Sequence, residues 1–191
     1  FSLYKKDKKI TDAKCSQSGY HNMYNGCLAA AICHHLGADA GMIREGLENA
    51  RMEEHRMQIL ELEEITVLDD CYNASPVSVM GALDTLDLIS RKNNKRSIAI
   101  LGDMLELGKS AEELHYNTGK YAAKKDIDVL VTSGKLAKNI CRGFMEDKEN
   151  SENCHSYDDS KKVIGDLENI IKSGDIILVK GSRANKLEDI I

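Results

Sequence analysis

The sequence predicts an α/β protein with a mostly parallel sheet. Short apolar runs alternate with helical segments along the second half of the chain, as expected for strands joined by helices. Apolar and charged residues make up 42% and 30% of the 191 positions, as in globular proteins that bury a core. Acidic residues number 31 against 26 basic ones, so there is no basic surplus for a phosphate backbone and we expect no nucleic-acid partner.

The amino-terminal third predicts two helices. Residues Asn25–Leu36 are rich in Ala and Leu and are followed by Gly37, a common helix stop. A second helix is expected over Ala40–Glu48. The polar residues His21–Asn25 precede the first helix, where they either cap it or contact a ligand at its amino terminus.

A strand and a long helix come next. Ile65–Leu68 is a β-branched run that ends in Asp69 and Asp70, so two carboxylates are expected at the carboxyl end of a strand. Ligand sites of open α/β sheets favour that edge. Apolar residues at helical spacing then predict a helix over Val77–Ile89, with a cap and a first turn supplied by Ser75–Pro76.

The second half of the chain alternates regularly between strands and helices. This repeat predicts a Rossmann-like domain with a mostly parallel sheet and right-handed connections. The expected elements are strands Ile98–Leu101, Val129–Thr132, Cys154–Tyr157 and Ile176–Val179, and helices Ala111–Lys125, Leu136–Met145 and Ser160–Ile171.

A basic, polar connector, Arg91–Arg96, predicts a domain boundary because it contains no apolar anchor. The boundary would place residues 1–91 in one domain and residues 92–191 in the Rossmann-like domain. The alternative is that the connector is a solvated loop between a helix and a strand.

The sequence indicates neither a membrane span nor a secretion signal. No apolar run approaches the roughly 20 residues that cross a bilayer. The opening FSLYKKDKKI lacks the apolar core of a signal peptide. We therefore expect a cytoplasmic protein.

The cysteines and histidines predict no metal centre. The six cysteines are scattered without a C-x-x-C pair, so we expect reduced thiols. His34 and His35 diverge on a helix and are not expected to share a metal. The cysteines are Cys15, Cys27, Cys33, Cys71, Cys141 and Cys154.

Two loops at expected strand ends carry groups suited to binding. Strand Ile98–Leu101 leads into Gly102–Gly108, which contains Asp103 and Glu106. The last strand leads into Lys180–Arg183, where a cation, a glycine and a hydroxyl could hold a carboxylate or a phosphate. Together the two loops could bind a zwitterion. The alternatives are that the acids are turn and helix-entry residues and that the second loop is simply basic.

Other features have a binding and a structural interpretation. Arg56 lies in a charged stretch and either bridges phosphate oxygens or is solvated. His115 is expected to be a structural histidine. The chain contains no G-x-x-x-x-G-K-[ST] motif, and therefore no P-loop, and no G-x-G-x-x-G motif for a dinucleotide.

Four segments together resemble the Mur ligases of bacterial peptidoglycan synthesis. They are HNMYNGCLAA (His21–Ala30), LDDCYNASPVSVMGALDTL (Leu68–Leu86), AILGDMLELGKSAEELHYNTGK (Ala99–Lys120) and LVKGSRANKLEDI (Leu178–Ile190), and they occur in the family's order. The second and third segments resemble the branch of the family that adds D-alanyl-D-alanine. The resemblance runs from about Tyr20 to the end of the chain.

The resemblance implies ATP-dependent amide formation. In the family, the terminal carboxylate of UDP-N-acetylmuramoyl-tripeptide is phosphorylated to an acyl phosphate, which the amine of D-alanyl-D-alanine attacks with release of ADP and phosphate. ATP and Mg²⁺ are the implied cofactors, and a monomer is the default. The family's P-loop, magnesium ligands and carbamylated lysine lie upstream of the matched segments. No metal ligand is therefore expected here, and this chain alone is expected to be inactive.

The resemblance also implies residue roles. Positions matching nucleotide-binding motifs are His21, Asn22, Asn25, Arg56, Asp70, Tyr72 and Asn73. Positions matching the cleft of the C-terminal domain, where substrate would be held, are Asp103, Lys180, Ser182 and Arg183. The first three of these four are the expected catalytic residues. Asn25 is the expected adenine contact.

In the family's terms, residues 1–91 correspond to the end of the central ATP-binding domain and residues 92–191 to the C-terminal domain. The family has a longer stretch before His21, so we expect residues to be missing between about Gly19 and Tyr20. Two alternatives stay open. One is a free-standing ligand-binding module with the family's C-terminal fold, and the other is a ligase related to folylpolyglutamate synthases.

Overall fold

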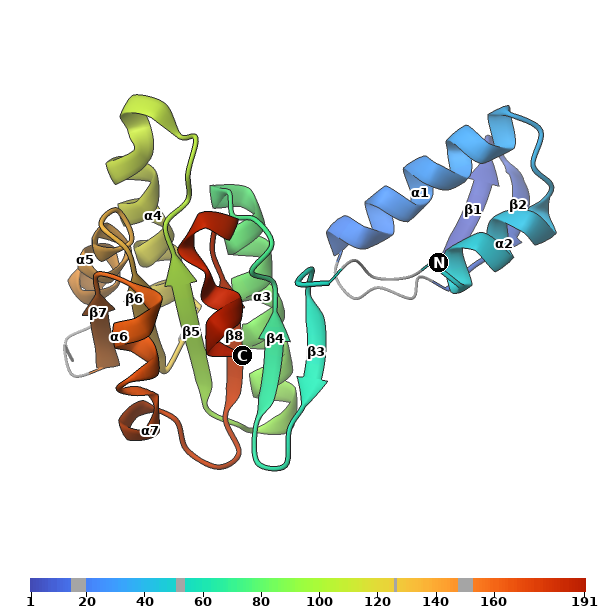
Figure 1. Ribbon diagram of the computed structural model, residues 1–191. Helices are drawn as coiled ribbons and strands as arrows, with labels where there is room; N and C mark the ends of the chain where they lie inside the picture. The colour runs from blue at the N-terminus through green and yellow to red at the C-terminus, as the bar shows by residue number, and fades with distance from the viewer. Residues whose placement is uncertain (15–19, 51–53, 126, 148–152) are drawn as a thin grey trace. The chain divides into compact units, whose positions relative to one another are not determined.

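The chain forms two compact units, Phe1–Glu53 and Glu54–Ile191 (Figure 1). The computed structural model describes residues 1–14, 20–50, 54–125, 127–147 and 153–191. Each unit has its own buried apolar core. Within the described residues, no helix combines the length and apolarity needed to cross a bilayer.

The first unit is a β-hairpin with two helices. Its elements are β1 (Ser2–Lys5), β2 (Lys8–Asp12), α1 (Tyr20–His35) and α2 (Ala40–Glu48). Both expected helices are confirmed, although α1 begins five residues earlier than Asn25. The Asp39 carboxylate caps α2 by accepting a hydrogen bond from the Met42 N–H at 2.9 Å. The hairpin, whose strands are largely exposed, was not expected.

A six-stranded sheet with the order β3-β4-β8-β5-β6-β7 forms the centre of the second unit. The strands are β3 (Gln58–Glu61), β4 (Thr66–Asp69), β5 (Ser97–Gly102), β6 (Val129–Ser133), β7 (Cys154–Tyr157) and β8 (Ile176–Lys180). Neighbours from β4 to β7 are parallel, and β3 at the edge runs antiparallel to β4. The predicted α/β class with a mostly parallel sheet is confirmed.

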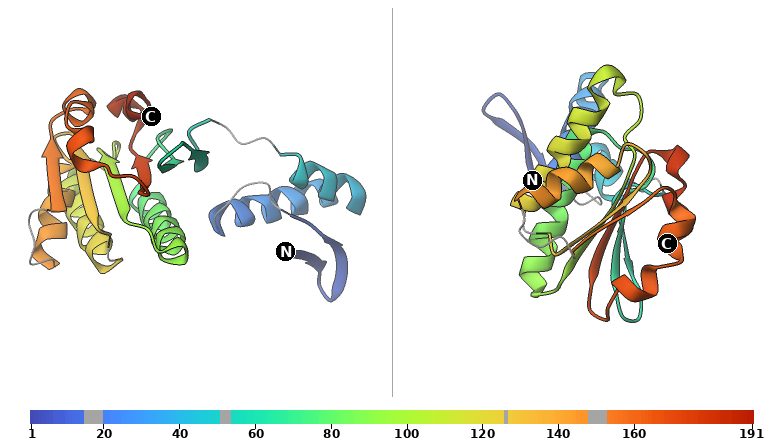
Figure 2. Two further views of the ribbon diagram at one scale, coloured as in Figure 1. Left: turned by 90° about the horizontal axis from the view of Figure 1, so that it is seen from below. Right: turned by 90° about the vertical axis from the view of Figure 1, so that its left-hand side faces the viewer.

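Helices cover both faces of this sheet (Figure 2). One face packs against α3 (Pro76–Asn93), α4 (Ala111–Lys124) and α5 (Lys138–Asp147), and the other against α6 (Ser160–Ile164), α7 (Leu167–Ile170) and the 3₁₀ turn Leu187–Ile190. Strand β8 shows the two-sided burial, because Leu178 lies in the first core and Val179 in the second. Burial on both faces explains why these strands are continuous apolar runs.

Two glycines allow α4 and α5 to pack with their backbones in contact. A Cβ atom at Gly119 would lie 1.9 Å from the Ile140 carbonyl oxygen. A Cβ atom at Gly143 would lie 2.0 Å from the Tyr116 carbonyl oxygen. Any larger residue at either position must push the helices apart.

The start of α3 follows the expectation closely. The Ser75 hydroxyl accepts a hydrogen bond from the Ser78 N–H at 3.3 Å, and the Ser78 hydroxyl accepts one from the Ser75 N–H at 2.9 Å. This reciprocal pair is a capping box, and Pro76 occupies the first turn. The loop before α3 is therefore held at a defined point beside the end of β4.

The expected domain boundary at residues 91–96 is wrong. Strand β4 precedes this connector, yet it pairs in parallel with β8, which follows it. Residues 91–93 of the connector are the end of α3, and residues 94–96 are the solvated loop that leads to β5, whereas the compact unit begins at Glu54. Arg96 fixes the end of the connector, because its guanidinium contacts the Asp175 carboxylate at 2.9 and 2.7 Å. A lack of apolar residues here marks a surface loop and not a break in the core.

Two smaller expectations also differ from the structure. The single helix expected over Ser160–Ile171 is two short helices, interrupted at Gly165 and Asp166. Cys141 and Cys154 form a disulfide, so reduced thiols were the wrong expectation for this pair. Cys27, Cys33 and Cys71 are free. Cys15 and the break expected before Tyr20 concern residues 15–19, which lie outside the described residues.

Candidate functional site

The residues singled out in the second unit gather at one edge of the sheet. Parallel strands β4, β8, β5 and β6 all end there, so the loops that follow them lie side by side. Among the site residues predicted in this unit, Asp70, Asn73, Asp103 and Lys180 follow or end these strands. Their positions agree with the strand-end placement expected from the sequence.

Lys180 connects the loop after β4 to the end of β8. Its Nζ atom lies 2.6 Å from Asp70 Oδ2 and 2.9 Å from the Asn73 carbonyl oxygen. The Lys180 side chain is 3% exposed and that of Asp70 15%, so the ion pair is largely shielded from water. The other Asp70 oxygen accepts a hydrogen bond from the Met57 N–H at 3.1 Å. Two motif segments that are 110 residues apart thus meet through one buried contact.

Tyr72 contacts two arginines. The Arg56 guanidinium carbon is 4.2 Å from the centre of the Tyr72 ring, and that of Arg183 is 5.6 Å from it. Cation–π attraction accounts for both contacts. Two cations and one aromatic ring thus meet at the strand-end edge, and this surface is chemically suited to an anionic, ring-containing ligand.

Asp103 and Ser182 hold neighbouring loops in place. The Asp103 carboxylate accepts hydrogen bonds from the N–H groups of Leu136 and Ala137, at 3.0 and 2.7 Å. The Asp103 carbonyl accepts one from the Ser182 N–H, and the Ser182 hydroxyl accepts one from the Leu105 N–H at 3.0 Å. These contacts join the loops after β5, β6 and β8. The contacts of the Asp103 carboxylate are those expected of a turn residue, and its contact with a ligand stays a prediction.

His115 has the structural role that was expected. It is fully buried, and its Nε2 atom accepts a hydrogen bond from the Met104 N–H at 2.9 Å. Its Nδ1 atom lies 2.6 Å from the Ala111 carbonyl oxygen. With both ring nitrogens engaged, His115 supports the loop that follows Asp103.

The remaining predicted nucleotide-binding residues belong to the first unit. His21, Asn22 and Asn25 lie in the first two turns of α1. Asn22 is half-buried and Asn25 is exposed, while the side chain of His21 lies outside the described residues. Their role as a nucleotide-binding set stays a prediction.

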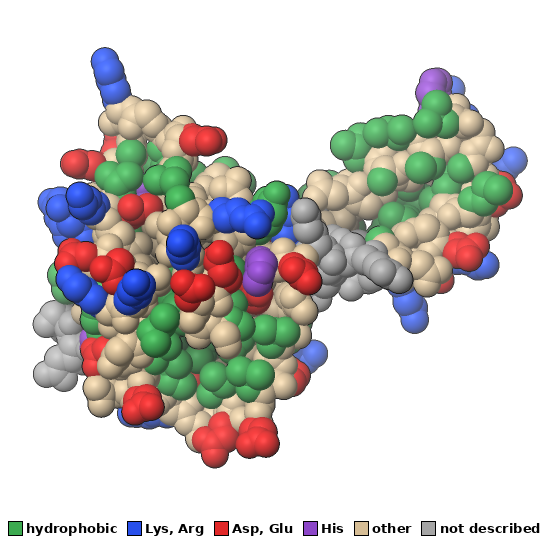
Figure 3. Space-filling model, viewed as in Figure 1, with side chains coloured by type: hydrophobic (Ala, Val, Ile, Leu, Met, Phe, Trp, Pro, Cys, Tyr) green, Lys and Arg blue, Asp and Glu red, His purple; other side chains and the backbone are tan. Residues whose placement is uncertain are grey.

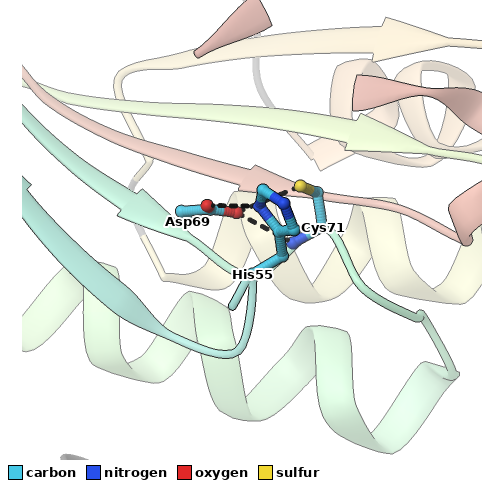
Figure 4. A group of neighbouring side chains, drawn as sticks. All are labelled: His55, Asp69 and Cys71. Atoms are coloured by element: carbon cyan, nitrogen blue, oxygen red, sulfur yellow. Dashed lines mark hydrogen bonds and ion pairs between the residues drawn. The ribbon is translucent and has the colours of Figure 1, made fainter. Parts of the chain in front are cut away.

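His55, Asp69 and Cys71 form a cluster that was not expected from the sequence (Figure 4). His55 Nδ1 lies 2.7 Å from Asp69 Oδ2, and Cys71 Sγ lies 3.0 Å from Asp69 Oδ1. Burial, and then the Asp69 carboxylate, raise the pKa of the Cys71 thiol, which therefore stays protonated at neutral pH. Only the strand-end position of Asp69 was visible in the sequence. His55 reaches it because β3 and β4 form a hairpin.

Comparisons with known proteins identify relatives of this chain. Residues 55–183 match the family model described as Mur ligase, glutamate ligase domain. The UDP-N-acetylmuramoyl-tripeptide–D-alanyl-D-alanine ligase of Bacillus subtilis is 30% identical over 174 residues, covering 91% of this chain and 37% of that protein. The corresponding ligase of Escherichia coli is 30% identical over 176 residues, covering 91% of this chain and 36% of that protein.

Solved structures show the same arrangement. A crystal structure of MurF from Acinetobacter baumannii superposes with a TM-score of 0.85 at 25% identity, covering 100% of this chain and 40% of that one. MurF from Thermotoga maritima in complex with ADP shares the fold, with a TM-score of 0.74 at 22% identity, over 100% of this chain and 44% of that one. This chain thus spans less than half the length of these relatives. The family match, the relatives and the fold together show that this chain belongs to the Mur ligase family.

Proposed function

We propose that this chain is the carboxyl-terminal part of an ATP-dependent ligase that joins D-alanyl-D-alanine to UDP-N-acetylmuramoyl-tripeptide. The observation that carries the proposal is the buried contact of Lys180 with Asp70 and Asn73. It joins the D-D-C-Y-N-A-S-P loop, which resembles this branch of the family, to the K-G-S-R loop, which lies in a segment that resembles the family as a whole. Relatives named for this reaction in Bacillus subtilis and Escherichia coli support the same conclusion.

We infer that Arg56, Tyr72 and Arg183 form the nucleotide side of the site. Two guanidinium groups can neutralise phosphate charge, and both contact the Tyr72 ring, which helps to position them. Asp70 and Asn73 would act from the same loop, with Asp70 near the ribose. The ADP complex of the Thermotoga maritima relative supports a nucleotide in this family, and release of ADP is part of the proposal.

We infer that Asp103, Lys180 and Ser182 lie on the substrate side, with Arg183 at its boundary with the nucleotide side. The first three are each engaged by a neighbouring loop, so in this arrangement they fix the shape of the edge. Rigidly held polar groups of this kind favour catalysis by orienting the reactants and offsetting charge in the transition state. The Asp103 carboxylate and the Lys180 cation lie on the same edge, where they suit the amine and the carboxylate of a dipeptide.

The full reaction needs ATP and Mg²⁺, whose main ligands we place in upstream sequence. An exposed apolar stripe on the first unit supports a further domain that packs against it. The stripe runs along α1 and the residue after it, and its side chains are 52–79% exposed: Tyr24, Leu28, Ile32 and Leu36. Hydrophobic side chains accordingly gather over this unit in Figure 3. We propose that the rest of an ATP-binding domain covers the stripe, that the ligase is cytoplasmic and monomeric, and that this chain alone does not turn over.

The test is ADP release by the natural polypeptide that contains this sequence. We expect ADP only when UDP-N-acetylmuramoyl-tripeptide and D-alanyl-D-alanine are both present. Arg183→Ala should weaken the apparent affinity for ATP, whereas Lys161→Ala, which removes an exposed cation on α6, should not. Turnover with glutamate and a folate would favour the folylpolyglutamate synthase alternative. Ligand binding without ADP release under any combination would favour a binding module.

A further inference from the structure

The cluster of His55, Asp69 and Cys71 brings an imidazole, a carboxylate and a thiol to one point. The three donor atoms, one from each residue, all lie within 4.8 Å of one another. Asp69 is central, since one of its oxygens faces His55 and the other faces Cys71 (Figure 4). Asp69 and Cys71 are each 2% exposed, and His55 is 39% exposed at its side chain, which leaves a route from solvent to the cluster.

We propose that His55, Asp69 and Cys71 form a binding site for a divalent transition-metal ion, with Zn²⁺ as the best match. Sulfur, nitrogen and oxygen donors are the ligand types that Zn²⁺ takes in proteins. Mg²⁺ and Ca²⁺ prefer oxygen ligands alone, so a thiol and an imidazole argue against them. Three protein ligands leave one tetrahedral position open to solvent on the exposed side of His55.

The donor atoms need little movement to bind such an ion. Ligand bonds of about 2.0–2.3 Å at tetrahedral angles separate donor atoms by about 3.3–3.6 Å. The contacts of Asp69 Oδ2 with His55 at 2.7 Å and of Asp69 Oδ1 with Cys71 at 3.0 Å would lengthen by less than about 1 Å. Donor atoms that lie up to 4.8 Å apart would close by at most about 1.5 Å. On binding, the ion takes the place of the Cys71 thiol proton, which passes to solvent.

The backbone holds the three side chains in position. The His55 carbonyl accepts a hydrogen bond from the Tyr72 N–H at 3.0 Å, and the Met57 N–H donates to Asp70. His55 and Met57 have φ values of 61° and 52°, a left-handed conformation that is unusual for side chains of this size. The segment before β3 is therefore clamped to the loop after β4, and the clamp aims the imidazole at Asp69.

The charge around the cluster also favours a cation. Glu188 lies close enough to Cys71 for its carboxylate to act electrostatically on the thiol. Its Oε2 atom is buried without a hydrogen-bond partner among the described residues. Lys180, the nearby buried cation, contacts Asp70 instead. Uncompensated negative charge is costly in a buried site, and a metal ion would offset that of Asp69 and Glu188.

The bound ion would stabilise the nucleotide side of the edge. His55 is adjacent to Arg56, and Cys71 is adjacent to Tyr72. A metal ion bound to His55 and Cys71 would therefore hold Arg56 next to the Tyr72 ring that its guanidinium contacts. The inference does not rest on the proposed ligase activity, because the metal site is built by residues 55–71 alone. Its test is therefore separate from the assay of ligation.

The proposal is tested by adding Co²⁺ to the purified chain after a chelator has removed any bound metal. Tetrahedral Co²⁺ bound to a thiolate gives a sulfur-to-metal charge-transfer band and intense visible bands, and Zn²⁺ should abolish both by competition. The variants are Cys71→Ser and His55→Ala, each checked for folding by circular dichroism. Cys33→Ser is the matched control, because Cys33 is a free and exposed cysteine of the first unit.

We expect one equivalent of Co²⁺ per chain, loss of the charge-transfer band in Cys71→Ser and at least about tenfold weaker binding in His55→Ala. Cys33→Ser should match the wild type. Absence of the band in the wild-type chain would overturn the proposal. A band that survives Cys71→Ser, or Co²⁺ affinity that is unchanged by His55→Ala, would do so as well.

Discussion

Replacing Lys180 by Met removes the cation that joins the ends of β4 and β8 and keeps the volume of its side chain. The Asp70 carboxylate then stays 15% exposed without the partner that now lies 2.6 Å away. Breaking a buried ion pair by removing one member costs about 3–5 kcal/mol. Asp70 keeps the hydrogen bond from Met57, which places the expected loss near the lower end, at about 3 kcal/mol.

The double variant Asp70→Asn/Lys180→Met distinguishes the ion pair from general loss of packing. With both charges removed, no unpaired charge is left, so the double variant should be more stable than the sum of the single changes by about 1–3 kcal/mol. Urea unfolding measures the stability of each variant. If the free energy of unfolding falls by about 2 kcal/mol per M urea, Lys180→Met should lower the midpoint by about 1.5 M. Hydrogen exchange in β8 assigns the transition to the second unit. Additive effects, or a single-variant loss under about 0.5 kcal/mol, would refute the reasoning.

Three further predictions follow from particular contacts. Gly143→Ala should destabilise the folded protein by at least about 1–3 kcal/mol, because the added methyl group meets the backbone of α4. Gly46→Ala is the control: its Cβ has open space around it, so the change should be neutral or slightly stabilising. Thermal melts measure both. Ser75→Ala should cost about 1 kcal/mol by removing the cap of α3, measured by chemical unfolding. Burial and the Asp166 carboxylate raise the pKa of Tyr157 from 10.0 to about 12, so the native phenol holds its proton longer than the unfolded one. Stability should therefore fall as pH rises from about 10 to 12, and Tyr157→Phe should lose that dependence.

Much of the second unit could be predicted from the sequence because its strands are buried on both faces. Strands such as β5 and β8 appear as continuous apolar runs, and the polar residues that follow them mark the edge at which the candidate site was predicted. The Ser75–Pro76 signal also located the start of α3 correctly. These features depend on short stretches of sequence, which periodicity and capping rules describe well.

What could not be predicted depends on contacts between distant segments. The polar connector after α3 resembled a boundary because nothing local shows that β4 pairs with β8. Strand β3 alternates exposed and half-buried residues among charges, so it gave no strong strand signal. His55 reaches Asp69 only through that hairpin, and the partner of Lys180 lies 110 residues away. The predicted edge was right, but its pairings required the fold.

The measurement that tests the proposed ligation most directly follows ¹⁸O from the tripeptide carboxylate. The natural polypeptide containing this sequence would be incubated with ATP, D-alanyl-D-alanine and UDP-N-acetylmuramoyl-tripeptide labelled at its terminal carboxylate. An acyl phosphate passes one carboxylate oxygen to the phosphate when the amine attacks, so we predict ¹⁸O in the released phosphate, dependent on the dipeptide. Unlabelled phosphate, or phosphate release that is indifferent to D-alanyl-D-alanine, would contradict the account.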